Sequence, residues 1–233
     1  FGFHTPSDTS PTSTNLTWAS TINDHGLQIY AVKSPGEFAE VVTPLSKVKD
    51  AYFVVEDSQG NTLLTSSIFR NVYENERWNL SLTIRPKRYP LSDGVLDSSV
   101  ATTGYEIGLY GVNFDTGVKQ NYFNSTADLT YASGSSIIDS AKRVYVGAHK
   151  TNFTGSTITS TDVRTSSTRY WTDYFPPAVL DLQAKQLDTH GSLHPSRNAY
   201  LFQTASAGVY IPSIQTISLN WEFSDVTPSV ILI

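Results

Sequence analysis

The chain contains no cysteine and no methionine, and few of its residues are charged. Without cysteine there is no disulfide, no thiolate metal site and no thiol nucleophile, so stability has to come from burial of a core. Charged residues make up 16% of the 233 residues, whereas about a quarter is typical of globular proteins. The net charge of −5 offers no attraction to nucleic acid or to an anionic membrane, so we expect neither as a partner. No apolar run approaches the roughly 18 residues of a membrane-spanning helix.

The first residues differ in composition from the rest of the chain. Residues 1–16 are rich in Ser, Thr and Pro, which indicates a linker or a loosely held arm. We expect residues 17–233 to form a single domain, since all-β domains of this length are common. Because the chain starts at Phe1 and not at a methionine, we expect this domain to be part of a longer polypeptide or assembly.

Aromatic residues, Ser and Thr are abundant, and their arrangement favours β-strands. The clearest run is Trp78–Arg85, in which four apolar residues alternate with four polar ones. Strict alternation predicts a strand with one buried face and one face in water, as in an antiparallel sheet. The residues Asp57–Asn61 lie between two short apolar runs and predict a hairpin turn.

Similar runs elsewhere predict further strands, and only one segment favours a helix. The strand Tyr105–Phe114 contains Gly108 and Gly111, which indicate a bulge, sharp curvature or a close approach of backbones. The one short helix is expected near residues 178–188, with Pro177 at its start and an apolar stripe of Val179, Leu180, Leu182 and Leu187. Many short strands with a single helix predict an all-β antiparallel sandwich of two sheets, not an alternating α/β fold.

The middle of the chain contains its most distinctive sequence blocks, which are Trp78–Pro86, Tyr105–Gly111, Arg143–His149, Asn152–Gly155, Asp162–Arg164 and Arg169–Tyr174. This series of blocks resembles the laminin-G-like branch of the concanavalin A-like lectin and glucanase jelly rolls. The match spans roughly residues 25 to 223, and this version of the pattern is associated with structural and tail proteins of tailed bacteriophages. The resemblance implies a jelly roll of two curved sheets and an extracellular or virion location.

The resemblance also implies a calcium ion at a sheet rim, because laminin-G-like domains often hold one. Calcium takes several oxygen ligands, mainly from carboxylates and carbonyls. The loops that offer them contain Asp115 in one case, and Asp162 near Asp173 in the other. Solvated loop acids are the alternative for each of these residues.

A catalytic role is not expected from the acidic residues. Glucanases of this fold carry a Glu-x-Asp-x-x-Glu strand, and this spacing does not occur in the sequence. A glycosidase needs two carboxylates about 5 to 9.5 Å apart in a groove. Glu74, Glu76, Glu106 and Asp115 are the candidates, and the hypothesis of an enzyme requires two of them to converge.

Aromatic side chains are the candidates for ligand contact. Arg169, Tyr170, Trp171 and Tyr122 could form a platform on which a sugar stacks, since aromatic rings combine an apolar body with a polar edge. Packing within the sheets is the alternative. We therefore expect a non-catalytic structural or adhesive module that contacts glycan, protein or other subunits, with a polysaccharide-active enzyme as the alternative.

Overall fold

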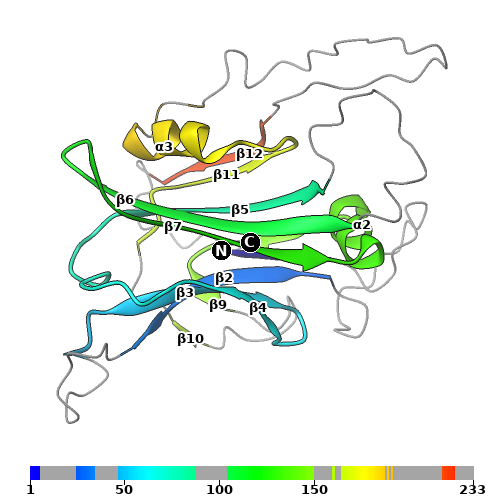
Figure 1. The fold of residues 1–233 in the computed structure, drawn as a ribbon, viewed down its shortest axis with the longest axis horizontal. Coiled ribbons are helices and arrows are strands. Elements are labelled where there is room, and N and C mark those ends of the chain that lie inside the picture. The colour runs from blue at the N-terminus through cyan, green and yellow to red at the C-terminus, as the bar shows by residue number, and fades with distance from the viewer. Residues whose placement is uncertain are drawn as a thin grey trace.

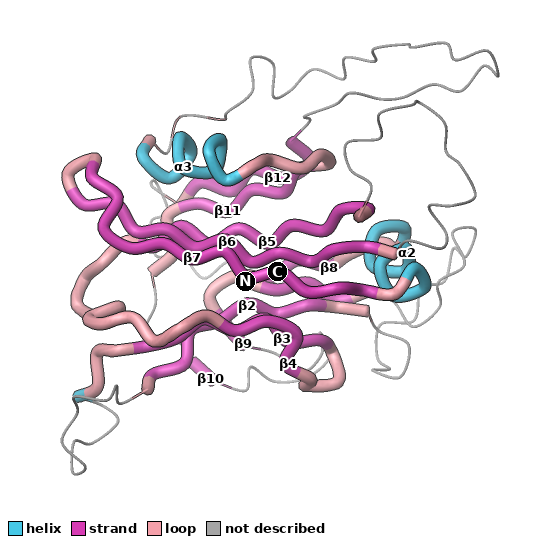
Figure 2. Tube along the Cα trace, in the orientation of Figure 1, coloured by secondary structure: helices cyan, strands magenta, loops and turns pink. Residues whose placement is uncertain are grey.

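Two antiparallel sheets packed face to face form the centre of the computed structural model (Figure 1). The structure describes residues 1–5, 25–34, 47–87, 104–149, 159–160, 164–186, 188, 190 and 217–223. Strands make up the larger part of the regular structure in the described residues, which also includes two α-helices (Figure 2). The expectation of a mostly β, antiparallel structure is therefore confirmed.

The larger sheet has five antiparallel strands in the order β4-β3-β2-β1-β8. They are β1 (Gly2–His4), β2 (Leu27–Lys33), β3 (Ala51–Asp57), β4 (Thr62–Thr65) and β8 (Arg143–Tyr145). β1 lies between β2 and β8, and Phe3 and His4 are each 3% exposed. The prediction of a loose arm over residues 1–16 is therefore wrong for residues 1–5, while residues 6–16 lie outside the described residues.

The predicted hairpin at Asp57–Asn61 joins β3 to β4. Asp57 accepts hydrogen bonds through Oδ1 from the backbone N–H groups of Gln59 and Asn61, at 2.9 and 2.8 Å. Gly60 has a φ of 81°, a left-handed conformation that glycine adopts without steric cost. The turn therefore has a local cause, which is why the sequence alone predicted it.

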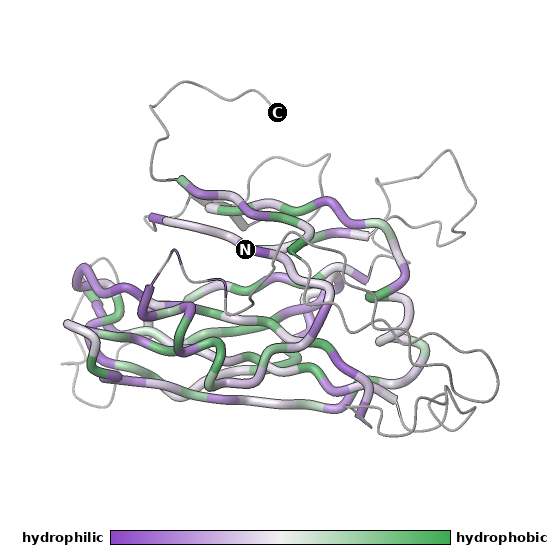
Figure 3. The backbone as a smooth tube through the Cα atoms, turned by 90° about the horizontal axis from the view of Figure 1, so that it is seen from above, coloured by the Kyte–Doolittle hydropathy of each residue, from purple (hydrophilic) through white to green (hydrophobic). Residues whose placement is uncertain are grey.

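The smaller sheet has three antiparallel strands in the order β5-β6-β7. They are β5 (Trp78–Pro86), β6 (Tyr105–Asp115) and β7 (Val118–Leu129). The apolar face of β5 packs, as predicted, against a core between the two sheets. Within that core the rings of Phe53 and Phe123 stack with centroids 5.5 Å apart, and Trp78 lies 4.9 Å from Phe53. Figure 3 shows hydrophobic and hydrophilic stretches interspersed along the backbone of the described residues.

The other face of the smaller sheet is covered, which differs from the prediction of a face in water. The helix α3 (Pro177–Lys185) packs over β6, and Leu180 and Ala184 join Tyr110 and Val112 in a second apolar cluster. Arg85, on the supposed wet face, is half-buried with its guanidinium 4.5 Å from the ring centroid of Tyr174. The three-stranded sheet is thus the middle of three layers.

The expected helix near residues 178–188 is confirmed as α3, although its inward face differs in detail. Leu182 was expected on the buried stripe but is 53% exposed, and Gln183 is buried instead. Gln183 donates a hydrogen bond of 2.8 Å to the carbonyl of His190. This bond satisfies a polar group that would otherwise be costly to bury.

A second helix, α2 (Tyr131–Asp139), was not predicted from the sequence. Its Gly- and Ser-rich composition is unfavourable for an isolated helix. Thr130 caps its first turn by accepting a hydrogen bond from the N–H of Ser133, and Ile137 enters the core between the sheets. Gly134 lies against the ring of Tyr105 so closely that no larger side chain fits. Tertiary packing therefore outweighs the weak helical propensity.

Two pairs of short strands lie outside the main sheets, so the described residues form four sheets and not two. The pairs are β9 (Ala148–His149) with β10 (Thr159–Ser160), and β11 (Ser167–Trp171) with β12 (Ile217–Glu222). The larger pair, β11 and β12, lies beside α3 in the third layer (Figure 1).

Gly108 and Gly111 leave room for side chains of the neighbouring strands, which differs from the predicted close approach of two backbones. A Cβ at Gly111 would collide with the ring of Phe123 on β7, and one at Gly108 would meet the hydroxyl of Thr83 on β5. The register irregularity of β6 and β7 lies instead between Asn113 and Phe114. The glycines thus allow neighbouring side chains to lie over the backbone of β6.

Candidate functional site

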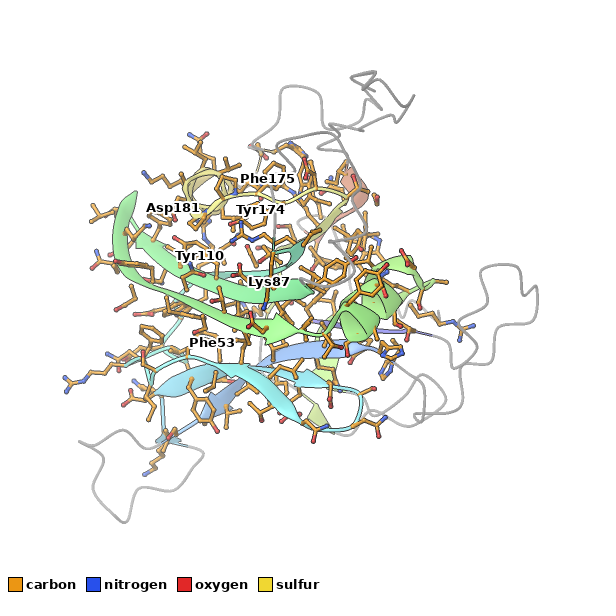
Figure 4. The ribbon with its side chains drawn as sticks, turned by 45° about the vertical axis from the view of Figure 1, so that its right-hand side comes forward. Phe53, Lys87, Tyr110, Tyr174, Phe175 and Asp181 are labelled. Atoms are coloured by element: carbon orange, nitrogen blue, oxygen red, sulfur yellow. The ribbon has the colours of Figure 1, made fainter. Side chains whose placement is uncertain are left out.

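Three polar residues from three elements meet on the covered face of the middle sheet. The phenol of Tyr110 in β6 donates a hydrogen bond to Asp181 in α3, with the two oxygens 2.5 Å apart. The ammonium of Lys119 in β7 lies 2.5 Å from the other carboxylate oxygen of Asp181 and 3.1 Å from the Tyr110 phenol. Figure 4 shows Tyr110 and Asp181 facing each other between the sheet and the helix.

A bulge in β7 places Lys119 in this cluster. Asn113 of β6 pairs with Asn121, but Phe114 pairs with Lys119, so Gln120 is an extra residue in β7. Without the extra residue, Lys119 would point to the opposite face of the sheet, because side chains alternate along a strand. The bulge therefore turns the ammonium toward α3.

The cluster holds its protons over a wide pH range. Burial, followed by the hydrogen bond to Asp181, raises the pKa of the Tyr110 phenol. Burial lowers the pKa of Lys119, but its hydrogen bonds to Asp181 and Tyr110 outweigh that effect, and the net pKa is raised. The phenol is neutral and the ammonium is charged at neutral pH, so the cluster joins α3 to the sheet through a hydrogen bond and an ion pair.

A polar groove of about 680 Å³ opens at one end of the middle sheet. Its walls come from the turn before β5, the connection between β6 and β7, and the end of α3. The lining residues are Asn75, Glu76, Arg77, Asn113, Phe114, Asp115, Thr116, Gly117, Gln120, Asn121 and Lys185. We call this feature the polar groove.

The β6–β7 connection that borders the polar groove is a two-residue turn. Thr116 and Gly117 both have positive φ values, 47° and 83°. Two successive positive φ values are typical of the type I′ turn, whose twist matches that of paired strands. The bulge residue Gln120 lies just beyond, so the turn and the bulge together place its amide in the groove wall.

Several side chains of the groove are held in place by bonds within the protein. Asn113 is 4% exposed, and its amide nitrogen donates a hydrogen bond of 3.0 Å to the carbonyl of Arg77. The guanidinium of Arg77 donates to the carbonyl of Ala184 at 2.8 Å. The ammonium of Lys185 lies 5.3 Å from the ring centroid of Phe114. The groove wall is therefore preorganised, which lowers the entropic cost of binding a ligand.

The charges that line the polar groove balance. Two carboxylates, Glu76 and Asp115, face two cations, Arg77 and Lys185. The remaining polar lining includes the amides of Asn75, Asn113, Gln120 and Asn121. Each amide carries donors and acceptors, so the groove can match hydroxyl groups, which also donate and accept. This composition favours a neutral polyhydroxylated ligand over an anion or a cation.

Two of the four acidic residues examined for catalysis lie in the polar groove. They are Glu76, which also accepts a hydrogen bond from the indole N–H of Trp78, and Asp115. Glu74 is exposed and paired with Lys49. Glu106 lies elsewhere on the sheet, where it accepts hydrogen bonds from the Arg85 guanidinium at 2.8 and 3.0 Å.

The predicted ligand-contact residues of β11 are largely occupied by packing within the protein. The side chain of Arg169 is 9% exposed, and its guanidinium donates a hydrogen bond of 3.2 Å to Asn220 and lies 3.8 Å from Glu222. Trp171 packs edge-on against Phe175 with ring centroids 4.9 Å apart. Burial raises the pKa of the Tyr170 phenol and lowers that of Arg169. Their predicted role in ligand binding stays a prediction.

Tyr122, the fourth predicted contact residue, does lie on the surface. It is 62% exposed on β7, and the ammonium of Lys119 is 4.8 Å from its ring centroid. It belongs to the middle sheet, whereas Arg169, Tyr170 and Trp171 belong to the β11–β12 pair. An exposed ring of this kind can contact a partner.

The acidic residues considered for calcium are not gathered in the described residues. Asp115 ends β6, while Asp173 lies next to Tyr174, whose ring covers Arg85 at the opposite end of the sheet. Arg85 pairs with Glu106, nine residues from Asp115 and thus roughly 30 Å away along the strand. Asp162 lies outside the described residues. Within the part that the structure describes, no group of three His, Cys, Asp or Glu residues could hold a metal ion, so calcium stays a prediction.

Sequence reasoning missed most of the polar groove, including Asn75, Arg77, Gln120 and Lys185. These residues lie far apart in the chain and share no spacing that signals chemistry. The one available signal was the Asp115-Thr116-Gly117 segment, since Gly after a small polar residue marks a tight turn. That signal locates the turn but not the residues brought next to it.

The described helices are too short and too polar to cross a membrane. Comparisons of the chain with protein-family models, with curated proteins and with solved structures found no match.

Proposed function

We propose that this chain is a non-catalytic structural and adhesive module that binds a neutral glycan in the polar groove. The observation that carries the proposal is the lining of the groove, in which four amides accompany two carboxylates and two cations. A sugar presents many hydroxyl groups and no net charge, so this lining complements it. Preorganised polar groups of this kind give orientation and specificity to a ligand site.

The fold supports the proposal at a general level. Antiparallel sheets packed face to face are compatible with a concanavalin A-like jelly roll, the architecture that the sequence blocks resemble. The jelly-roll topology and an extracellular or virion location belong to the proposal. They rest on the resemblance to laminin-G-like domains and to phage structural proteins.

Glycan binding can be tested with a glycan array, followed by calorimetry on the strongest neutral glycan. Gln120→Ala and Asn121→Ala each remove one groove amide and should weaken binding by about tenfold, corresponding to roughly 1.4 kcal/mol. Gln59→Ala removes an exposed amide from the hairpin between β3 and β4 and should leave binding unchanged. The proposal fails if no neutral glycan binds, or if all three variants bind like the parent chain.

A polysaccharide-active enzyme is the second candidate, favoured by the presence of Glu76 and Asp115 in one groove. A glycosidase would use one carboxyl group as acid and the other as base or nucleophile. Release of reducing sugar from polysaccharides distinguishes the two functions. Release that is lost in Glu76→Gln and in Asp115→Asn would establish the enzyme. Binding without release would support the adhesive module.

A further inference from the structure

The strand β7 forms an edge of the middle sheet. In the described sheets it pairs with β6 on one side only, over 12 residues from Val118 to Leu129. An edge strand presents a row of backbone donors and acceptors that another strand can use. The central segment Asn121–Thr126 contains no charge, proline or glycine, so it lacks the features that usually prevent such pairing.

The charges at the ends of β7 have opposite signs. Lys119 lies near the start of the strand and Asp128 near its end. The bulge puts Lys119 on the face that also carries Tyr122, while Asp128 pairs with Glu106 on that face. The side chain of Asp128 is 75% exposed and that of Lys119 is 32% exposed. Both side chains are therefore accessible, although each also forms an ion pair within its own chain.

We propose that β7 pairs with β7 of a second copy of this chain, antiparallel and symmetric about Asn124. In this register, Tyr122 of one copy lies opposite Thr126 of the other. Counting outward from Asn124, the position opposite Asp128 would be Gln120. Because Gln120 is the extra residue of the bulge, Lys119 takes this position instead. The same ion pair therefore forms once on each side of the twofold axis, two pairs in all, as an isologous interface requires. Parallel pairing in register would place like charges together, which is unfavourable.

The pairing joins two middle sheets into one continuous sheet of six strands. It is argued from the edge and the end charges of β7, so it does not depend on the proposed function, although Gln120 and Asn121 at the start of β7 also line the groove. Seven residues separate Asn124 from Gly117 at the groove, or about 23 Å along the strand. The symmetry places the two grooves at opposite ends of the sheet, roughly 45 Å apart. A paired molecule would therefore present two ligand sites, which increases avidity for a repeating surface.

A single cysteine tests the register directly, because the chain has no cysteine of its own. Asn124→Cys places two thiols next to the twofold axis, where opposite Cα atoms lie about 4.5 to 5.5 Å apart, within the Cα separation that a disulfide spans. Under mild oxidation we expect a disulfide-linked pair on a non-reducing gel. Ser218→Cys, at an exposed position of β12, is the matched control and should stay unlinked. Equal linkage of both variants, or none of Asn124→Cys, would overturn the proposal.

Charge variants at the same position provide a second measurement. Asn124→Lys and Asn124→Asp each place like charges together on the axis and should raise the dissociation constant by at least about tenfold. An equimolar mixture of the two variants should recover the pair, because the charges are then opposite. Sedimentation velocity measures the association, and circular dichroism confirms that each variant is folded. A parent chain that sediments as a monomer at its highest soluble concentration would contradict the proposal, as would variants that pair like the parent.

Discussion

The phenol of Tyr110 and the carboxylate of Asp181 are 2.5 Å apart although 71 positions separate them in the chain. The hydrogen bond joins the centre of the middle sheet to α3, and Lys119 contacts both groups. Burial of Tyr110, which is 4% exposed, excludes water that could replace a lost partner. The docking of the third layer therefore depends on polar contacts such as this one as well as on apolar packing.

Tyr110→Phe should lower the free energy of unfolding by about 1.5 to 3 kcal/mol, the range for a hydrogen bond to a charged group. The substitution keeps the ring and removes only the hydroxyl, so Asp181 loses a donor. Tyr122→Phe removes a hydroxyl from a ring that is 62% exposed and should change stability by less than about 0.5 kcal/mol. Urea denaturation of the three proteins provides the comparison, and equal effects of both variants would contradict this account.

Stability should decrease above about pH 10, where free Tyr and Lys side chains lose their protons. The pKa values of Tyr110 and Lys119 are raised in the fold. Their contribution is therefore complete below the unfolded pKa values and is lost as the pH rises through the folded ones. Tyr30, Tyr105 and Tyr170 also have raised pKa values, chiefly through burial, and share in the decrease.

The share due to Tyr110 can be isolated by repeating the pH series with Tyr110→Phe. This variant should lose less stability between about pH 9 and pH 11 than the parent chain does. A parallel decrease in both proteins would show that the Tyr110 phenol does not have a raised pKa.

Gly111→Ala should destabilise the protein by about 1 to 3 kcal/mol, because the added methyl group meets the ring of Phe123. In a Phe123→Leu background the same change should cost less, since the aliphatic side chain leaves room above the β6 backbone. A double-mutant cycle measures this coupling. Additive effects would mean that the contact with Phe123 is not the cause.

Glu106→Gln should cost more stability than Glu74→Gln. Both partners of the Arg85–Glu106 pair have side chains that are 29% exposed, and the ring of Tyr174 covers the guanidinium. Removing one charge leaves the other partly buried, at a cost of about 1 to 2 kcal/mol after allowance for solvent screening. Glu74 and Lys49 are about half exposed, and such surface pairs contribute at most about 1 kcal/mol. Thermal unfolding at low and high salt checks the difference, because salt weakens the exposed pair more.

The strands and the hairpin turn could be predicted because their causes are local. Alternation along Trp78–Arg85 identified β5 and its core face, and the Asp57–Asn61 turn forms its own hydrogen bonds. The helix α3 followed from Pro177 and an apolar stripe. The helix α2 could not be predicted, because Gly134 and the serines favour a helix only once Tyr105 and the core lie beside them.

The candidate site was less predictable than the fold. Asp115 and Glu76 were identified as acidic residues worth testing, but nothing in the sequence indicated that they share a groove. Arg85 was predicted to lie on a face in water. Alternation shows only that the two faces of a strand differ, and it does not show which other elements pack on them. The same limit applied to Lys119, whose direction depends on one extra residue in β7.

The sequence by itself determined the β-rich class, the principal strands, the turn at Asp57–Asn61 and one helix, since each depends on neighbours within a few residues. Only the tertiary structure decided that residues 2–4 form an inner strand of a sheet, that a third layer covers the middle sheet, and that a charge-balanced groove forms at its end. These features depend on contacts between residues tens of positions apart. Such contacts are set by packing and by the bulge in β7, neither of which leaves a periodic signal in the chain.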